Sequence, residues 1–199
     1  MIPLSTRMRP QTLEEFQGQE HFLYPGSLFY NSIKNKTFDS AIFFGPSGTG
    51  KTTLARIIAR EMDGDFLEIN ASAAGTKELK ELTERARDRF FGLEKKTTYV
   101  YVDEFHRWNK LQQDSLLKSL EEGVIKFIGS TTENPYFAVN NAVLSRVRNI
   151  YEFRRLDRQH LTSIIERAIH DREKGIGALG ISWEEDLSLI RISEPTRPY

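Results

Sequence analysis

The residue types best suited to chemistry are concentrated in one run near the first quarter of the chain. The run reads Gly45-Pro46-Ser47-Gly48-Thr49-Gly50-Lys51-Thr52, followed by Thr53. It fits the pattern G-x-x-x-x-G-K-[ST], in which glycines let backbone N–H groups wrap around a phosphate chain. The lysine supplies a mobile positive charge for the terminal phosphates, and the threonine hydroxyl is a ligand for Mg²⁺. The run therefore predicts a nucleotide-binding loop.

The segments on either side of this loop must position it. The apolar run 41–44 is typical of a buried strand, and residues from Leu54 to Met62 have helical spacing. A phosphate bound there would lie at a helix N-terminus, where anions are favoured. The alternative is a glycine-rich turn with an incidental lysine, which these flanking segments disfavour.

Two adjacent acids follow a second apolar run. Asp103 and Glu104 come directly after Tyr99-Val100-Tyr101-Val102, so a strand would deliver them to the carboxyl edge of the sheet, where ligands bind in open α/β folds. Asp103 would hold Mg²⁺, and Glu104 would orient and deprotonate the attacking water. Two acids at a strand end are also common as a solvated turn, but the upstream loop favours the catalytic interpretation.

Further polar residues leave alternatives open. A hydroxyl of Ser130-Thr131-Thr132, after another apolar run, would contact the terminal phosphate or cap a turn. Arginines outnumber acids between residues 141 and 158, and they would neutralise a transferring phosphoryl group, contact DNA phosphates or form a solvated patch. These arginines are Arg146, Arg148, Arg154, Arg155 and Arg158. The four histidines have no metal-ligand spacing, and Trp108 and Trp183 are interpreted as packing residues.

Bulk composition restricts the class of protein. The 199 residues carry 28 basic and 28 acidic side chains, so no global field attracts nucleic acid. The chain has no cysteine, which excludes disulfides and Cys-based zinc sites. The first seven residues lack the apolar stretch that is typical of a signal peptide, and no run approaches the ~18 apolar residues of a membrane span. We therefore expect a soluble, cytoplasmic protein without a membrane partner.

Strand and helix signals alternate from residue 41 onward, which predicts an α/β fold with a parallel sheet. The predicted strands are 41–44, 65–69, 98–102, 124–129 and 150–153. Helices are expected at 76–90, from an Asn109 cap to a stop at Gly123, and along a stripe from Leu161 to Ile169 closed by Gly175.

Longer strings carry a resemblance to a known family. They are Arg7-Met8-Arg9-Pro10, Glu15-Phe16-Gln17-Gly18-Gln19, the segment from Asp103 to Asp114 and the segment from Ile128 to Pro135. The third is similar to D-E-[VI]-H-R-F-N-K-x-Q-Q-D, with Trp108 in place of phenylalanine, and the fourth to I-G-A-T-T-E-N-P, with Ser130 in place of alanine. Over about residues 4–183 the chain thus resembles AAA+ ATPases of the replication-associated recombination protein A family, which includes the Werner-interacting ATPase.

The resemblance implies a fold and a set of roles. It implies a P-loop NTPase (AAA+) fold, a three-layer parallel sheet of order 5-1-4-3-2 followed by the start of a helical lid. ATP and Mg²⁺ are the implied cofactors. Thr132 matches the sensor-1 position, with Thr131 adjacent to it, and Arg146 matches the arginine finger that completes a neighbouring subunit's site.

The resemblance also implies partners and domain limits. We expect DNA at forks, single-strand gaps or duplex ends, a homo-oligomer, and single-strand-binding protein as a candidate partner; a bacterial protein would be associated with the nucleoid. The alternatives are a clamp-loader subunit, a Holliday-junction branch-migration motor or a non-catalytic scaffold. The expected domains are a nucleotide-binding core at 1–154, the beginning of a truncated lid at 155–186 and a non-native tail at 187–199.

Overall fold

The chain divides into two compact units. The computed structural model describes residues 2–73, 75–92 and 96–179. One unit is Gln19–Arg155, and the other combines the described residues up to Gly18 with those from Leu156 onward. Trp183 and the expected tail at 187–199 lie outside the described residues. Among the described helices, none is long and apolar enough to cross a membrane.

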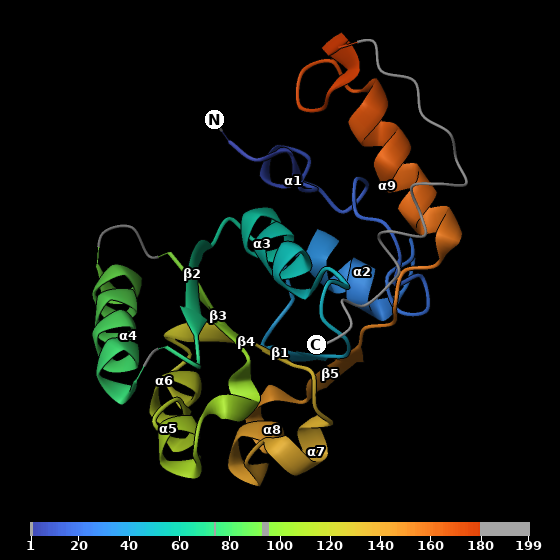
Figure 1. Cartoon of the computed structure of the whole chain (residues 1–199). Coiled ribbons are helices and arrows are strands. Elements are labelled where there is room, and N and C mark those ends of the chain that lie inside the picture. Colours follow the sequence, from blue (N-terminus) through green and yellow to red (C-terminus); the bar gives the residue numbers. More distant parts are fainter. Residues whose placement is uncertain (1, 74, 93–95, 180–199) are drawn as a thin grey trace. The chain divides into compact units, whose positions relative to one another are not determined.

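The larger unit is built on a five-stranded parallel sheet (Figure 1). Its strands run in the spatial order β2-β3-β4-β1-β5, which confirms the predicted order 5-1-4-3-2. They are β1 (Ala41–Phe44), β2 (Asp65–Asn70), β3 (Thr98–Asp103), β4 (Ile125–Thr131) and β5 (Asn149–Glu152). The sheet confirms all five predicted strands, and the structure shifts their ends by no more than two residues.

Helices cover both faces of this sheet (Figure 1). Those of the described part of the unit are α2 (Leu28–Lys34), α3 (Lys51–Glu61), α4 (Thr76–Phe91), α5 (Lys110–Asp114), α6 (Leu117–Glu121), α7 (Pro135–Ala138) and α8 (Asn141–Val147), with the 3₁₀ turn η1 (Phe105–Arg107) after β3. Side chains alternate along a strand. Val100 and Val102 therefore join the core beneath α4, α6 and α8, whereas Tyr99 and Tyr101 face the opposite layer with α3.

The predicted helix from Asn109 to Gly123 is divided in two. Asn109 caps α5 and forms a capping box with Gln112, as the sequence predicts for a cap. Ser115 and Leu116 separate α5 from α6, although their backbone stays in the right-handed helical region. The N–H of Leu116 donates to the carbonyl of Gln113, a tighter hydrogen bond than the α-helical one, so the turn is overwound at this point.

The smaller unit consists of α1 (Leu4–Arg7), α9 (Arg158–His170) and η2 (Gly177–Leu179) with their described connections. Arg167 of α9 donates to the carbonyls of Met8 at 2.7 Å and Glu15 at 3.0 Å. The prediction that Gly175 closes this helix was wrong, because α9 ends at His170. Gly175 lies in a turn that folds back on the helix, where the N–H of Ile176 donates to the carbonyl of Ala168.

Two backbones meet closely at Gly45, directly after β1. Its N–H donates to the Thr131 carbonyl at 3.0 Å, and the N–H of Phe153 donates to the Phe44 carbonyl at 2.7 Å. Gly45 has a φ of +140°, and a Cβ there would lie 2.1 Å from the Phe153 carbonyl oxygen. Only glycine fits where the loop leaves the sheet.

We predict that Gly45→Ala lowers the free energy of unfolding by roughly 3 kcal/mol, because it combines a disfavoured φ with a backbone clash. Gly26→Ala is the matched control, since Gly26 also has a positive φ, +93°, but none of the described atoms lies within 4 Å of its added Cβ. That variant should lose only about 1 kcal/mol. Equal losses in urea unfolding would contradict the role of the Phe153 contact.

Candidate functional site

The loop between β1 and α3 has the backbone of a phosphate cradle. Gly45, Gly48 and Gly50 all have positive φ, and Gly50 is the N-cap of α3. Because Gly50 has no side chain, no side-chain oxygen caps this helix, and its first turn carries no acid. The free N–H groups and the helix dipole favour an anion at this end. The predicted loop residues thus lie together, ahead of an eleven-residue helix.

Lys51 is buried within the loop that it follows. Its ammonium group donates to the carbonyl of Gly45 at 2.8 Å and to that of Pro46 at 2.7 Å. Burial lowers the pKa of Lys51, while the negative charges of Asp103 and Glu104 act in the opposite direction. The cation is therefore poorly hydrated, and phosphate oxygens would bind such a cation favourably.

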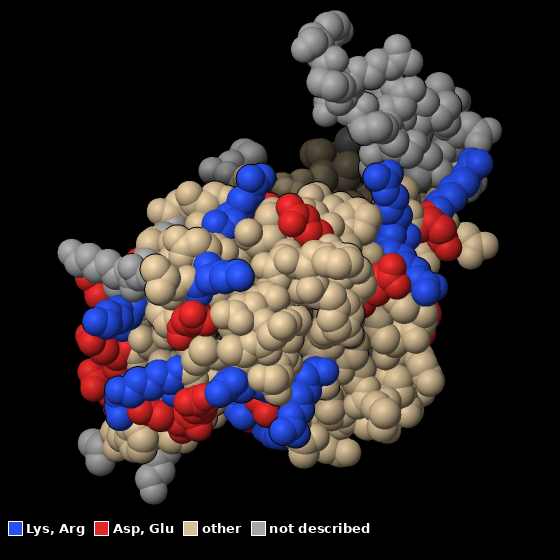
Figure 2. Space-filling view, turned by 90° about the horizontal axis from the view of Figure 1, so that it is seen from below, with Lys and Arg blue, Asp and Glu red and all other residues tan. Residues whose placement is uncertain are grey.

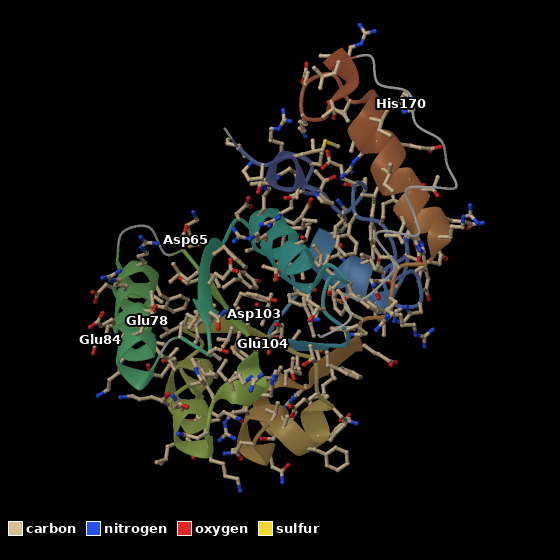
Figure 3. The ribbon with its side chains drawn as sticks, viewed as in Figure 1. Asp65, Glu78, Glu84, Asp103, Glu104 and His170 are labelled. Carbon is tan, nitrogen blue, oxygen red and sulfur yellow. The ribbon has the colours of Figure 1, made fainter. Side chains whose placement is uncertain are left out.

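Four side chains from three elements meet at the carboxyl end of β3. The hydroxyl of Thr52 lies 2.9 Å from that of Tyr101, and the Tyr101 hydroxyl donates to Oδ1 of Asp103 at 3.3 Å. Ser130 of β4 donates to the same Oδ1. The two predicted Mg²⁺ ligands, Thr52 and Asp103, are thus joined through Tyr101. Figure 3 shows Asp103 and Glu104 at the end of the sheet, whereas Glu78 and Glu84 lie out on α4.

Oxygen donors of this kind fit Mg²⁺, which prefers a carboxylate, a hydroxyl and phosphate oxygens. No group of three or more His, Asp or Glu side chains among the described residues could hold a metal ion. Such a site would need phosphate oxygens to complete the coordination of the cation, because Thr52 and Asp103 supply only part of it. The donor set therefore fits Mg²⁺ bound together with a nucleotide.

Glu104 adopts a strained backbone and contacts a buried histidine. Its φ of +56° lies in the left-handed region, which turns the chain from β3 into η1. Its carboxylate lies 3.3 Å from Nε2 of His106 and 3.9 Å from Nε of Arg107. His106 also contacts the Thr131 hydroxyl through Nδ1 at 3.1 Å. The predicted base is thus linked through His106 to the end of β4.

The two threonines at the end of β4 differ in exposure. Thr131 is buried, and its hydroxyl contacts His106 and accepts from the N–H of Glu133. Thr132, the predicted sensor, is exposed just beyond the strand. Its role stays a prediction.

Arg146 lies on α8, and its polar contacts are with its own helix and with α6. Its Nε donates to Oε1 of Glu121 at 2.7 Å, and its Nη1 donates to the Ala142 carbonyl at 3.0 Å. These contacts do not bring it to this chain's own loop. Figure 2 shows the face seen from below, on which Lys and Arg side chains are interleaved with Asp and Glu around a broad uncharged area. Arg148, Arg154 and Arg155 are exposed.

Sequence reasoning missed three residues that support the site. Tyr101 and His106 are described above, and the third is Gln19, which is buried. The Gln19 amide donates to the carbonyls of Arg154 at 2.8 Å and Thr49 at 3.4 Å, and it accepts from the N–H of Arg154 at 2.8 Å. It therefore ties the nucleotide loop to the segment after β5. Its only sequence signal was its place in the family-like string ending at Gln19.

Comparisons with known proteins agree with this geometry. The profile of the family described as "ATPase family associated with various cellular activities (AAA)" matches residues 41–155. The chain is similar to "Replication-associated recombination protein A" of Haemophilus influenzae, with 41% identity over 93% of this chain and 41% of that protein. The protein of the same name in Escherichia coli K12 is 43% identical over 90% of this chain and 39% of its own length. "ATPase WRNIP1" of Dictyostelium discoideum is 40% identical over 84% of this chain and 19% of its own length.

The fold is also similar to that of a solved structure, the RuvB Holliday junction branch migration motor of Thermotoga maritima. Its TM-score is 0.71 at 24% identity, covering 90% of this chain and 57% of that one. This likeness concerns the fold alone. The chain spans about two-fifths of the length of the bacterial relatives named above.

We predict that Gln19→Leu lowers the free energy of unfolding by about 2 kcal/mol, because it removes the buried side-chain partner of backbone groups of Thr49 and Arg154. The Arg154 amide should also exchange its hydrogen faster. Gln159→Leu, at an exposed position of α9, is the control and should change neither quantity. An unchanged rate of hydrogen exchange at the Arg154 amide in Gln19→Leu would contradict the role of Gln19 in linking the loop to the segment after β5.

Proposed function

The chain belongs to the ATPase family associated with various cellular activities (AAA), and on that premise we propose that the protein hydrolyses ATP in the maintenance of replication forks and in recombination. The observation that carries the proposal is the convergence of Lys51, Thr52, Asp103 and Glu104 at the carboxyl edge of the sheet. Such a set has the groups needed to bind phosphates and a divalent cation and to activate water.

Each residue of the set has a proposed part. Residues 45–53 form the phosphate-binding loop: its backbone N–H groups from residue 47 onward hold the phosphates, and Lys51 exchanges the carbonyls of Gly45 and Pro46 for phosphate oxygens. Thr52 and Asp103 hold Mg²⁺, which when bound neutralises charge on the phosphates. Glu104 orients a water molecule and accepts its proton, and the contact with His106 keeps its carboxylate in place. Thr132 is proposed to contact the terminal phosphate or the attacking water.

Arg146 is proposed to act on the site of a neighbouring copy. Its guanidinium is half-exposed and pairs with Glu121 of its own chain. A bound phosphate in another subunit would compete with Glu121 for it, and a planar guanidinium stabilises the charge of a transferring phosphoryl group. A homo-oligomer is therefore part of the proposal.

The proposed partner is DNA at forks, single-strand gaps or duplex ends, and single-strand-binding protein is a further candidate. The proposed location is the cytoplasm, at the nucleoid in a bacterium. The names of the 40–44% identical relatives support replication-associated recombination. A clamp loader, a branch-migration motor and a non-catalytic scaffold stay as alternatives. The proposed domains are a core at 1–154 and the beginning of a lid at 155–186.

We predict that Glu104→Gln in the full chain retains ATP affinity but loses at least ~100-fold in hydrolysis rate, because the amide cannot accept the proton. Lys51→Ala should instead weaken ATP binding itself. Equilibrium binding and steady-state phosphate release separate the two effects. Glu84→Gln, on α4 away from the site, is the control and should leave both unchanged. Full turnover in the Glu104 variant would exclude this residue as the base.

For Arg146 we predict recovery of activity on mixing. Arg146→Ala and Glu104→Gln should each be inactive alone, while a mixture of the two regains phosphate release. In the mixture, the Glu104→Gln protein supplies the arginine and the Arg146→Ala protein supplies the base. Arg155→Ala, an exposed arginine, is the control and should be active alone. A mixture that stays inactive, although the two proteins assemble together, would argue that Arg146 serves its own chain.

A further inference from the structure

Tyr101 is a buried hydroxyl for which nucleotide hydrolysis, as proposed, has no need. Its side chain is fully buried, and its ring stacks on that of Phe66 at a centroid distance of 5.9 Å. The hydroxyl lies 2.9 Å from Thr52 Oγ1 and 3.3 Å from Asp103 Oδ1. It therefore stands between the two side chains proposed to hold the divalent cation.

The chemistry of Thr52, Tyr101 and Asp103 decides which group donates in each of these two hydrogen bonds. Tyr101 is a phenol, which carries its one proton at neutral pH. A carboxylate only accepts, so the Tyr101 proton points to Asp103. Since a phenol has one proton, Thr52 must be the donor in its own contact with Tyr101.

This order leaves suitable oxygen atoms for a cation. A hydroxyl binds a cation through an oxygen lone pair, so its proton must point away from the cation. The proton of the Thr52 hydroxyl points to Tyr101. Ser130 and Tyr101 both donate to Oδ1 of Asp103, so among the described contacts Oδ2 is the oxygen left for a ligand. Partners of this kind outside the ligand set orient the ligands and strengthen metal binding.

We propose that Tyr101 is a positioning residue for the divalent cation: its hydroxyl accepts a hydrogen bond from Thr52 and donates one to Asp103, so that both ligands are oriented before the cation arrives. The inference rests on the proposed function, because it concerns the cation that accompanies the nucleotide. It predicts that loss of the Tyr101 hydroxyl changes how nucleotide binding depends on Mg²⁺, and that nucleotide affinity without Mg²⁺ stays the same.

Tyr101→Phe tests this directly, because it keeps the buried ring and removes only the hydroxyl. Tyr99→Phe is the matched control: Tyr99 is buried two residues earlier on β3, and its hydroxyl donates to the Phe38 carbonyl at 3.1 Å, away from Thr52 and Asp103. The measurement is the affinity of the full chain for a fluorescent ATP analogue, in EDTA and across a series of Mg²⁺ concentrations.

We expect the Mg²⁺ concentration for half-maximal strengthening of binding to rise about 10-fold in Tyr101→Phe. Affinity in EDTA should stay unchanged, and Tyr99→Phe should match the unaltered chain in both. An unchanged Mg²⁺ dependence in Tyr101→Phe, or an equal change in both variants, overturns the inference and leaves the proposed function standing. If Mg²⁺ fails to strengthen binding even in the unaltered chain, the proposed function and the inference fall together.

Discussion

The parallel alignment of β1, β3 and β4 is the constraint on which the site depends. Phe44 pairs with Thr131 and Val102 pairs with Gly129, so the three strands end at one edge of the sheet. That edge receives the glycine loop from β1, the acids from β3 and the hydroxyl residues from β4. The close approach of Gly45 to the Phe153 carbonyl leaves no room for a side chain where the loop leaves the sheet. The chemistry of the site follows from this shared edge.

The polar side chains at this edge provide partners for an anion and for a cation. Lys51 donates to two carbonyls of its own loop and lies near the charges of Asp103 and Glu104. A buried cation with neutral partners is costly unless a negative group replaces them. The same edge holds the hydroxyls of Thr52, Tyr101 and Ser130 against Asp103. The protein thus holds both a cationic and an anionic half of a site, which a nucleotide with its cation would join.

Much of this arrangement could be predicted from the sequence, and the rest depends on contacts between distant residues. The strands and the loop have local signals: apolar runs, and glycines at positions that require positive φ. The role of Tyr101 has no such signal, and Gln19 has only its place in a family-like string, because each role depends on partners that only the folded chain brings close. Tyr101 has the apolar surroundings of a strand residue, so its hydroxyl carried no signal. The division between α5 and α6 and the end of α9 at His170 also escaped prediction, since short-range hydrogen bonds decide them.

The proposed function requires that Lys51, Thr52 and Asp103 form one site for a nucleotide and its cation. An experimental structure of the full chain with Mg²⁺ and a non-hydrolysable ATP analogue tests it most directly. We predict that the Lys51 ammonium leaves the carbonyls of Gly45 and Pro46 for phosphate oxygens, with the cation between Thr52 and Asp103. Phosphates bound elsewhere, or a lysine that keeps both carbonyls while the nucleotide is bound, would contradict it.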